Sequence, residues 1–527
     1  MEILSVKNLT FRYDNSENPI LNNISFTVNK GEFVVVCGKS GCGKTTLLRL
    51  IKRSLSPSGR LEGDIFLEVS DLKIGYVFQN PESQLIMDNV FDELIFGCEN
   101  IGMNTSLIKL KLGELCAYLG IEDLLSKKCT ALSGGEKQLI NLAGVLMMEP
   151  EIIILDEPFS MLDPIASDTF LSILTRLHRE LGITVILCEH TLDNVLIEAS
   201  KILYFTDNAA VNNLLTFYNS DDFIEYISNE NPSYKYGLPP LARLGAYGAK
   251  KEIVKFKHYP LTVAEWKHLI LNTKKEELTD FLHTFLPREN HILSSNEAVI
   301  NLKNVCFRYE KNSNDIINHL SLSIQKGSLY AIIGGNGAGK TTLLSLLTGY
   351  RKPYSGKIKV LGTVGYLPQN PAYAFTDDNV LEDLKLICKN NHISYDIIDK
   401  TINLYPVFEE LKDYLNFNPL DLSGGQMQLM ALLKILLLSP DVLILDEPTK
   451  GLDGFHKDKL SKLFSLLRQN GTTIVMVSHD LNFVSENADR CGMMFMGTLS
   501  VSGSCNQVLS SNHFYTTALY RILKGLN

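Results

Sequence analysis

Two stretches of the sequence combine glycines, a lysine and a threonine at a spacing that suits phosphate binding. GKSGCGKTT at 38–46 fits the pattern G-x-x-x-x-G-K-[ST], and GGNGAGKTT at 334–342 fits it again. Glycines let the backbone come close to a phosphate, and the N–H groups at the start of the following helix cradle it. Lys44 and Lys340 would reach the β- and γ-oxygens, and Thr45 and Thr341 would ligate Mg²⁺. One match could be a glycine turn without a ligand, but two matches, each after an apolar run, favour phosphate binding.

Two acidic pairs follow short apolar runs. IIILD ends at Asp156 and LILD ends at Asp446, and both runs are typical of buried parallel strands. An aspartate at the end of such a strand can hold the Mg²⁺ shell. Glu157 and Glu447 come next, where a carboxylate can orient and deprotonate an attacking water. A single Asp-Glu-Pro would be a solvated strand exit, but here two copies follow two phosphate loops at nearly equal distances.

Neutral polar residues stand near both predicted sites. Gln79 and Gln369 each precede Asn-Pro in a loop, where they could touch Mg²⁺ or the attacking water. His190 and His479 each close an apolar strand and could bond a γ-phosphate. For either histidine alone, a purely structural role would be the better interpretation.

Two further features occur twice. Ser133 and Ser423 begin Ser-Gly-Gly segments and should cap a helix, where open backbone donors could form a second anion site in each half. An ordinary capped helix would explain a single copy. Tyr13 and Tyr309 follow short strands upstream of the phosphate loops and could stack on adenine, although ordinary packing explains them nearly as well.

The elements that position these residues form a tandem repeat. VKNLTFRY at 6–13 and LKNVCFRY at 302–309 are 296 positions apart, and later motif pairs are offset by 290 or 289. The first half therefore has six extra residues between the lysine and the glutamine, which we expect in a surface loop. We predict a first domain at 1–235, an inter-domain helical region at 236–297 and a second domain at 298–527. The joining residues, about 206–297, contain the only Trp, Trp266, and should pack on one of the halves.

The overall composition limits the partners. The net charge is −9, which gives no general reason to bind nucleic acid or an anionic membrane surface. The start of the chain is not typical of a signal peptide, and no apolar run is long enough to span a bilayer, so a membrane role requires a partner. The ten cysteines are scattered without any CxxC, which predicts reduced thiols rather than a zinc or iron–sulfur site.

Taken together, these residues resemble the ATP-binding-cassette (ABC) ATPases. The matched set comprises the Walker A loop, Q-loop, LSGG signature, Walker B strand with its glutamate, D-loop (Asp163 and Asp453) and switch histidine, in the same order in both halves. The resemblance implies an α/β fold of two tandem cassettes, each with a RecA-like core, an antiparallel β subdomain and a helical subdomain. It also implies a head-to-tail pseudo-dimer in which Lys44 and Ser423 frame one ATP, and Lys340 and Ser133 the other.

The resemblance assigns ATP and Mg²⁺ as cofactors and gives each candidate residue a role. Catalytic roles fall to Glu157, Glu447, His190, His479, Gln79 and Gln369. Magnesium contacts fall to Thr45, Gln79, Asp156, Thr341, Gln369 and Asp446. Nucleotide contacts fall to Tyr13, Gly38, Ser40, Gly41, Gly43, Lys44, Thr45, Thr46, Ser133 and Gly135, and to Tyr309, Gly334, Asn336, Gly337, Gly339, Lys340, Thr341, Thr342, Ser423 and Gly425. Because both sites keep the full set, we expect two hydrolytic sites.

A narrower resemblance concerns QNPESQ followed by DELIFG, which is similar to the ATPases of energy-coupling-factor (ECF) importers of vitamins and transition-metal ions. PLTVAEW is similar to a segment between the cassettes of their fused ATPases. This implies a peripheral protein on the cytoplasmic face of the membrane, bound to a transmembrane coupling component and a substrate-binding component. Gln84 of the first Q-loop is replaced by Ala374 in the second, so we hypothesise that the two loops suit two different coupling helices.

Three residues depart from the pattern that is usual in the ABC family. Glu189 stands where the family usually has Ser or Thr, and Leu139 and Leu429 stand where many signatures carry Arg. Cys42 lies inside the first phosphate loop, where a thiol near Lys44 could be reactive or could be an inert filler.

The alternative function is a soluble tandem-cassette translation factor on the ribosome. Such factors tend to have a basic linker between the cassettes, whereas the joining residues of this chain mix positive and negative charges.

Overall fold

The computed structural model describes residues 1–14, 16, 18–160, 162–206, 214–253, 256–272, 281–282, 297–513 and 515–524, with only the backbone at 232, 233 and 235. These residues form two compact units. The first unit comprises 1–246 and 256–261, and the second comprises 247–255 and 262–527, within the described positions.

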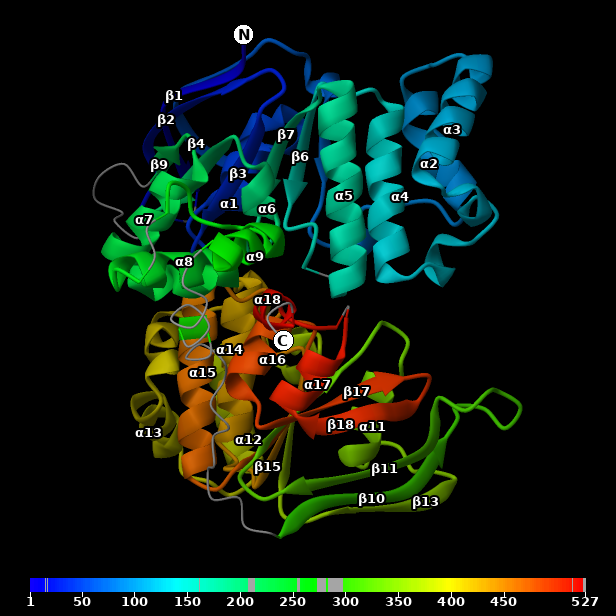
Figure 1. Cartoon of the computed structure of the whole chain (residues 1–527), viewed down its shortest axis with the longest axis vertical. Coiled ribbons are helices and arrows are strands. Elements are labelled where there is room, and N and C mark those ends of the chain that lie inside the picture. The colour runs from blue at the N-terminus through cyan, green and yellow to red at the C-terminus, as the bar shows by residue number, and fades with distance from the viewer. Residues whose placement is uncertain are drawn as a thin grey trace. The chain divides into compact units, whose positions relative to one another are not determined.

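The first unit contains two sheets (Figure 1). The antiparallel sheet has the order β2-β1-β4, formed by β1 (Glu2–Tyr13), β2 (Leu21–Asn29) and β4 (Gly59–Leu67). The central sheet has the order β5-β6-β7-β3-β8-β9, and only β9 runs antiparallel to its neighbour. Its strands are β3 (Phe33–Gly38), β5 (Ile74–Val77), β6 (Ile152–Asp156), β7 (Thr184–Cys188), β8 (Lys201–Phe205) and β9 (Leu214–Phe217).

Helices surround these sheets, and Figure 1 shows α4 and α5 side by side next to β6 and β7. The helices are α1 (Lys44–Ile51), α2 (Val90–Asn100), α3 (Thr105–Leu119), α4 (Gly134–Met147), α5 (Pro164–Leu181), α6 (Val195–Glu198), α7 (Ser220–Glu230) and α8 (Pro240–Lys250). Helix α8 begins in the first unit and ends in the second.

The second unit repeats this plan. Its antiparallel sheet has the order β11-β10-β13, and its central sheet the order β14-β15-β16-β12-β17-β18, with only β18 antiparallel to its neighbour. The strands are β10 (Ala298–Phe307), β11 (Ile317–Gln325), β12 (Leu329–Ile333), β13 (Ser355–Val360), β14 (Val364–Leu367), β15 (Val442–Asp446), β16 (Thr473–Val477), β17 (Arg490–Phe495) and β18 (Thr498–Ser504).

The helices of the second unit include one from the joining region. They are α9 (Val263–Asn272), α11 (Lys340–Leu347), α12 (Val380–Asn390), α13 (Asp396–Leu404), α14 (Gly424–Leu436), α15 (Gly454–Gln469), α16 (Leu481–Asn487), α17 (Cys505–Ser511) and α18 (Ala518–Leu523). Helix α9 packs against α18, and its Trp266 is fully buried. The expectation that the joining region packs on a half is therefore confirmed for α9.

The sequence pattern explains why these strands sit at the centre. All residues of β3, β6 and β7 are buried, as expected for parallel strands covered on both faces. One face packs against helices, and the other packs against α1 and the antiparallel sheet. In each central sheet the strand before the phosphate loop lies next to the strand before the histidine, which lies next to the strand that ends in aspartate. Because neighbouring parallel strands end at the same edge, this order gathers the predicted site residues there.

The six extra residues of the first half are not confined to a surface loop. Thr10 pairs with Glu62, and the matching Cys306 pairs with Ser355, so the two strand pairs can be aligned. From that point β4 continues to Gly59 and pairs with β1 as far as Tyr13, whereas β13 begins at Ser355. Part of the insertion therefore lengthens an exposed strand, and our loop prediction was wrong for that part.

Within the described residues, no helix combines the length and the apolar character needed to cross a membrane.

Candidate nucleotide sites

The phosphate loops have the conformation that their glycines predict. Gly43 has φ 101° and Gly339 has φ 97°, and each immediately precedes its helix. A Cβ at Gly43 would lie 2.8 Å from Leu21, and one at Gly334 would lie 2.3 Å from the carbonyl oxygen of Met494, so both positions require glycine. Helices α1 and α11 start at the lysines, and their first N–H groups therefore face the loop, as an anion-binding helix terminus requires.

Both lysine side chains fold back onto their own loops. Lys44 Nζ donates to the carbonyl oxygens of Gly38 at 3.1 Å and Lys39 at 2.6 Å. Lys340 Nζ donates to the carbonyl oxygens of Gly334 at 3.0 Å and Gly335 at 2.9 Å. The ammonium group is thus held beside the backbone donors in each unit, where a phosphate oxygen can replace a carbonyl as its acceptor.

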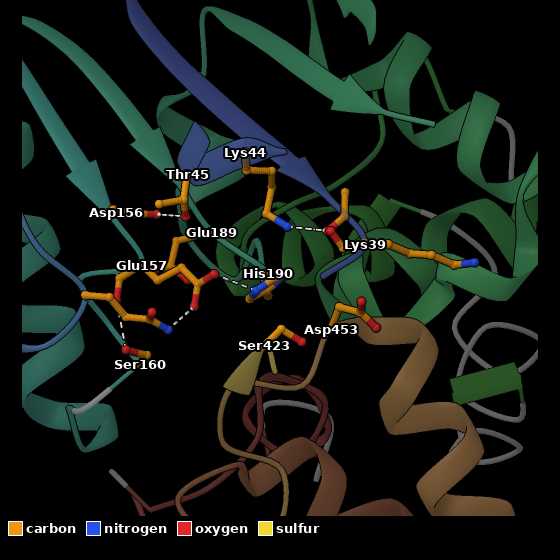
Figure 2. A network of polar contacts seen from close by, with 12 residues as sticks. Lys39, Lys44, Thr45, Asp156, Glu157, Ser160, Glu189, His190, Ser423 and Asp453 are labelled. Atoms are coloured by element: carbon orange, nitrogen blue, oxygen red, sulfur yellow. Dashed lines mark hydrogen bonds and ion pairs between the residues drawn. The ribbon is translucent and has the colours of Figure 1, made fainter. Parts of the chain in front are cut away.

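A threonine and an aspartate face each other in both units, as Figure 2 shows for the first. The Thr45 hydroxyl donates to Asp156 Oδ1 at 3.1 Å, and the Thr341 hydroxyl donates to Asp446 Oδ2 at 3.0 Å. Burial raises the pKa of both aspartates above the usual range. A divalent cation would compensate these poorly solvated carboxylates, and the hydroxyl and carboxylate oxygens are the donors that Mg²⁺ prefers.

The Cys188 sulfur lies close to the first carboxylates, but it does not suit Mg²⁺. Its ligand atom, with those of Asp156 and Glu157, forms a set within 4.8 Å. Burial raises the pKa of this thiol well above its ordinary value, so it stays protonated, and sulfur is a soft ligand. The second unit has Val477 at the matching position, so the donor set common to both units consists of oxygen atoms.

Glu157 is held from two sides in the first unit. The Gln79 side-chain amide donates to Glu157 Oε2 at 2.6 Å. His190 Nε2 lies 2.6 Å from Glu157 Oε1 (Figure 2). The Tyr76 hydroxyl donates to Asp156 Oδ2 at 3.1 Å. The structure therefore brings the predicted glutamine, glutamate, histidine and aspartate together around one end of the central sheet.

Glu447 has a different set of partners in the second unit. The backbone N–H of His479 donates to Glu447 Oε2 at 3.0 Å, and His479 Nε2 lies 3.4 Å from Oε1. Within the described residues, no hydrogen bond joins Gln369 to Glu447. Burial raises the pKa of Glu447 to about 8, and the positive charges of Lys340 and Lys450 moderate that rise.

Both glutamates have an unusual backbone conformation. Glu157 has φ 47° and Glu447 has φ 53°, in the left-handed region that residues other than glycine rarely adopt. Each N–H is anchored by the neighbouring strand, at 3.0 Å from the carbonyl oxygen of Cys188 and of Val477 respectively. Such strain persists where the surrounding structure fixes the residue, and here it fixes the direction of the carboxylate.

The residue before each histidine links the strand that carries the histidine to the loop after the glutamate, and the contact differs between the two units. Glu189 is buried, and its Oε1 accepts the N–H of Phe159 at 3.1 Å. Burial, followed by the charge of Glu157, raises the pKa of Glu189 well above its usual range, which favours the uncharged form. In the second unit the corresponding pair is Ser478 and Thr449, whose hydroxyls lie 3.3 Å apart. Both links connect the strand carrying the histidine to the loop that follows the glutamate.

The tyrosines and signature serines have clear local partners. The Tyr13 and Tyr309 hydroxyls lie 2.8 and 3.0 Å from the hydroxyls of Thr46 and Thr342. Both rings are partly exposed, so they flank the phosphate loops as predicted for adenine contacts, although stacking itself stays a prediction.

Ser133 and Ser423 each form a capping box with the residue three positions later, which confirms the helix-cap prediction. Within the described residues, no hydrogen bond joins Ser133 to the phosphate loop of its own unit. Asp163 and Asp453 cap α5 and α15 by accepting N–H groups at 2.9 and 2.8 Å. The remaining predicted residues, Ser40, Gly41, Asn336 and Gly337 in the phosphate loops and Gly135 and Gly425 in the signature helices, lie in those segments as the motifs place them.

Two tyrosines that contact residues of the first site, Tyr234 and Tyr76, could not be singled out from the motifs. Tyr234 is buried, and its hydroxyl donates to the carbonyl oxygen of His190 at 3.4 Å. Tyr234 lies in the joining region after α7, and only the aromatic spacing of that region could have pointed to it. Tyr76 was also missed; it lies three residues before Gln79, on β5.

Two phosphate loops with hydroxyl–carboxylate pairs at the ends of parallel sheets define a tandem P-loop nucleotide hydrolase. The chain matches the ABC transporter family over residues 21–160 and 317–450, and it belongs to that family. It is therefore an ATPase with two ABC domains that uses ATP and Mg²⁺. It is 37% identical over 545 residues to the "Putative ABC transporter ATP-binding protein" of Bacillus anthracis, covering 98% of this chain and 95% of that protein.

A further relative carries a more specific name. The "Putative HMP/thiamine import ATP-binding protein YkoD" of Bacillus subtilis is 30% identical over 543 residues, covering 97% of this chain and 93% of the relative. Among solved structures, a model of ribosome-bound archaeal Pelota and ABCE1 aligns with a TM-score of 0.66 at 21% identity, covering 98% of this chain and 80% of that one. The protein named RNase-L inhibitor aligns with a TM-score of 0.60 at 22% identity, covering 96% and 93%. These structural likenesses show the tandem-cassette fold.

Proposed function

We propose that this chain is the energising subunit of an ECF-type importer that takes up a vitamin or a transition-metal ion. The observation that carries the proposal is the near full-length similarity to the Bacillus subtilis relative named for HMP/thiamine import. In this role the chain lies on the cytoplasmic face of the membrane and binds a transmembrane coupling component and a substrate-binding component. ATP hydrolysis in the two cassettes drives the cycle.

The residues of the first unit divide the work of hydrolysis as follows. Lys44 and the loop N–H groups hold the phosphates. Thr45 and Asp156 would hold Mg²⁺, which would neutralise charge on the phosphate oxygens. Glu157 orients the attacking water and accepts its proton, while Gln79 and His190 fix the direction of its carboxylate through their 2.6 Å contacts. In the second unit the corresponding roles belong to Lys340, Thr341, Asp446, Glu447 and His479.

We further propose that each ATP is completed by the signature of the other cassette, so that Lys44 works with Ser423 and Lys340 with Ser133. The helix-capping role of both serines supports this, because a capped helix presents backbone donors for an anion. The sites then assemble only when the two cassettes close on nucleotide, which couples binding to a change of shape.

A single-site background tests this pairing. In a Glu447→Gln variant, single-turnover hydrolysis reports the site that contains Lys44 and Glu157. We expect Ser423→Ala to slow this remaining turnover and Ser133→Ala to leave it nearly unchanged. The opposite pattern would show that each cassette uses its own signature. The Glu157→Gln background provides the matched control, in which the two serines should exchange effects.

The importer role is tested by what the chain binds. A tagged copy purified from gently solubilised cells should carry small, very apolar integral membrane proteins, and their identity would narrow the solute. Recovery of ribosomal subunits instead would favour the alternative, a soluble tandem-cassette ATPase acting on the ribosome. The likeness to ABCE1 does not favour that alternative, because it shows a shared fold at 21% identity.

A further inference from the structure

The ring of Tyr309, beside the second phosphate loop, has a positive charge over it. The guanidinium carbon of Arg351 lies 4.8 Å from the centre of this ring, which is the geometry of a cation–π contact. The Tyr309 hydroxyl lies 3.0 Å from that of Thr342, and the ring forms a T-shaped pair with Phe307 at 5.2 Å between centroids. Three contacts therefore fix the ring, and Tyr309 is still 52% exposed.

The turn after helix α11 places Arg351 next to this tyrosine. Gly349 follows the residue that ends the helix, Thr348, and has φ 76°, a left-handed conformation that favours glycine. The N–H of Arg351 then returns to the carbonyl oxygen of Ser345 at 3.1 Å. The backbone of Arg351 is thus attached to the helix of the phosphate loop, and its side chain extends over the ring.

The first unit has the same tyrosine without this contact. Leu55 occupies the position of Arg351 at the offset of 296, and Arg53 replaces Gly349. The chain there forms a short 3-10 helix, and Leu55 packs against the core that includes the antiparallel sheet. Within the residues that the structure describes, no lysine or arginine lies over the ring of Tyr13.

A ring that is already ordered binds a planar ligand at a lower entropic cost. Bases stack on the faces of aromatic side chains, and an exposed tyrosine loses conformational freedom when a base orders it. The guanidinium of Arg351 removes part of that freedom before the nucleotide arrives. Tyr13 is 38% exposed, so both tyrosines keep surface for a base, and the units differ in the cation.

We propose that Arg351 is a positioning residue for base recognition in the second cassette, where it holds the ring of Tyr309 in the orientation that stacks on adenine. The two sites share their phosphate-binding motifs and then differ in how firmly they hold the base. The proposal rests on the adenine contact predicted for Tyr309, and it holds whatever partner the ATPase energises.

Steady-state kinetics of the full chain in the Glu157→Gln background report the second site. Arg351→Leu introduces the residue of the first unit and should raise KM for ATP about two- to fivefold, the scale of an exposed cation–π contact, with kcat unchanged. The inhibition constant of tripolyphosphate, a competitor without a base, should stay the same. In the Glu447→Gln background, which reports the first site, Arg351→Leu should change neither KM nor kcat.

A double-mutant cycle tests whether Arg351 acts through the ring. Tyr309→Ala alone should raise KM for ATP about tenfold, the scale of base–aromatic stacking, and Arg351→Leu should then add nothing. Arg351→Lys keeps a cation and should retain most of the affinity. An unchanged KM in Tyr309→Ala would show that the ring does not contact adenine, which would remove the premise whatever Arg351 does.

Three other results would overturn the proposal. An unchanged KM in Arg351→Leu would make the cation–π contact an ordinary surface contact. An equal loss of affinity for tripolyphosphate would mean that the charge of Arg351 acts on the phosphates. An undiminished effect of Arg351→Leu in the Tyr309→Ala chain would mean that Arg351 contacts the nucleotide directly. Because Arg351 is exposed, its variants should fold, and thermal unfolding checks this.

Discussion

The pKa of Glu447 makes the second site sensitive to pH in a predictable direction. Burial raises this pKa to about 8, so at neutral pH without nucleotide the carboxyl group is mostly protonated and cannot accept a proton from water. At pH 7 about one tenth of the chains carry the carboxylate, and at pH 9 about nine tenths do. In a Glu157→Gln background, kcat/KM should therefore rise about tenfold between these two values, because kcat/KM reports ionisation of the free enzyme.

The matched control concerns the charge beside Glu447. Lys450 lowers the pKa of Glu447, and the first unit has Ser160 at the same position. Lys450→Ser should therefore move the midpoint of the pH profile to higher pH. A kcat/KM that stays flat across about pH 7–9, or a midpoint that moves to lower pH in the Lys450 variant, would refute the assignment of Glu447 as the base.

The same shift predicts how stability depends on pH. The folded chain holds the proton of Glu447 up to about pH 8, whereas the ordinary value is 4.5. This contribution to stability is fully present below pH 4.5 and is lost as pH rises to about 8, with a slope of about 1.4 kcal/mol per pH unit between. Urea unfolding without nucleotide or Mg²⁺ should show a slope that is steeper by about 1.4 kcal/mol per pH unit in the parent chain than in Glu447→Gln, because the other buried carboxyl groups contribute equally to both chains. Equal slopes would contradict the burial argument.

Three further predictions concern other residues. The Cys42 sulfur lies 3.9 Å from Lys44 Nζ, so alkylation of Cys42 should block the first site, and ATP should protect it. The control is Cys42→Ala, which introduces the residue found at 338 and should make the chain insensitive to the reagent. Full activity after labelling of Cys42 would contradict the prediction. The Gln84 side chain accepts the N–H of Phe78 at 3.0 Å and donates to the carbonyl oxygen of Tyr76 at 3.1 Å. Gln84→Ala leaves this backbone donor and acceptor unpaired and should lower the free energy of unfolding by about 1–3 kcal/mol in urea titrations, so an unchanged midpoint would refute the role of its two bonds. Thr341→Val should weaken Mg·ATP binding at the second site about tenfold or more, without changing the binding of metal-free ATP. Both affinities can be measured by titration with a fluorescent nucleotide analogue. Equal losses of affinity with and without Mg²⁺ would argue against a Mg²⁺ contact.

The sequence predicted those parts of the sites that depend on local motifs. Glycine loops, strand ends and Ser-Gly-Gly caps are set by neighbouring residues, so the positions of Lys44, Asp156 and Ser133 followed from spacing and from the order of parallel strands. The tandem repeat likewise predicted two units with the same topology.

Contacts between distant segments could not be predicted in this way. Lys434 and Asp383 are 51 positions apart, and nothing in either local pattern shows that a lysine on an otherwise uncharged helix turns inward to an acid on another helix. The Gln79–Glu157 bond depends on how the first loop packs rather than on the shared motif, since the described part of the chain shows no matching bond at Gln369. The strand extension at Gly59 was missed because exposed strands and loops have similar compositions.

The fusion of two cassettes into one chain affects how their sequences can change during evolution. In a dimer of identical chains, any substitution appears on both sides at once, so an arginine that suited one ATP site would be imposed on the other. Here Arg351 and Leu55 are encoded separately, as are Ala374 and Gln84. Each ATP site and each Q-loop can therefore change one residue at a time, and the symmetry between the two halves is free to decay.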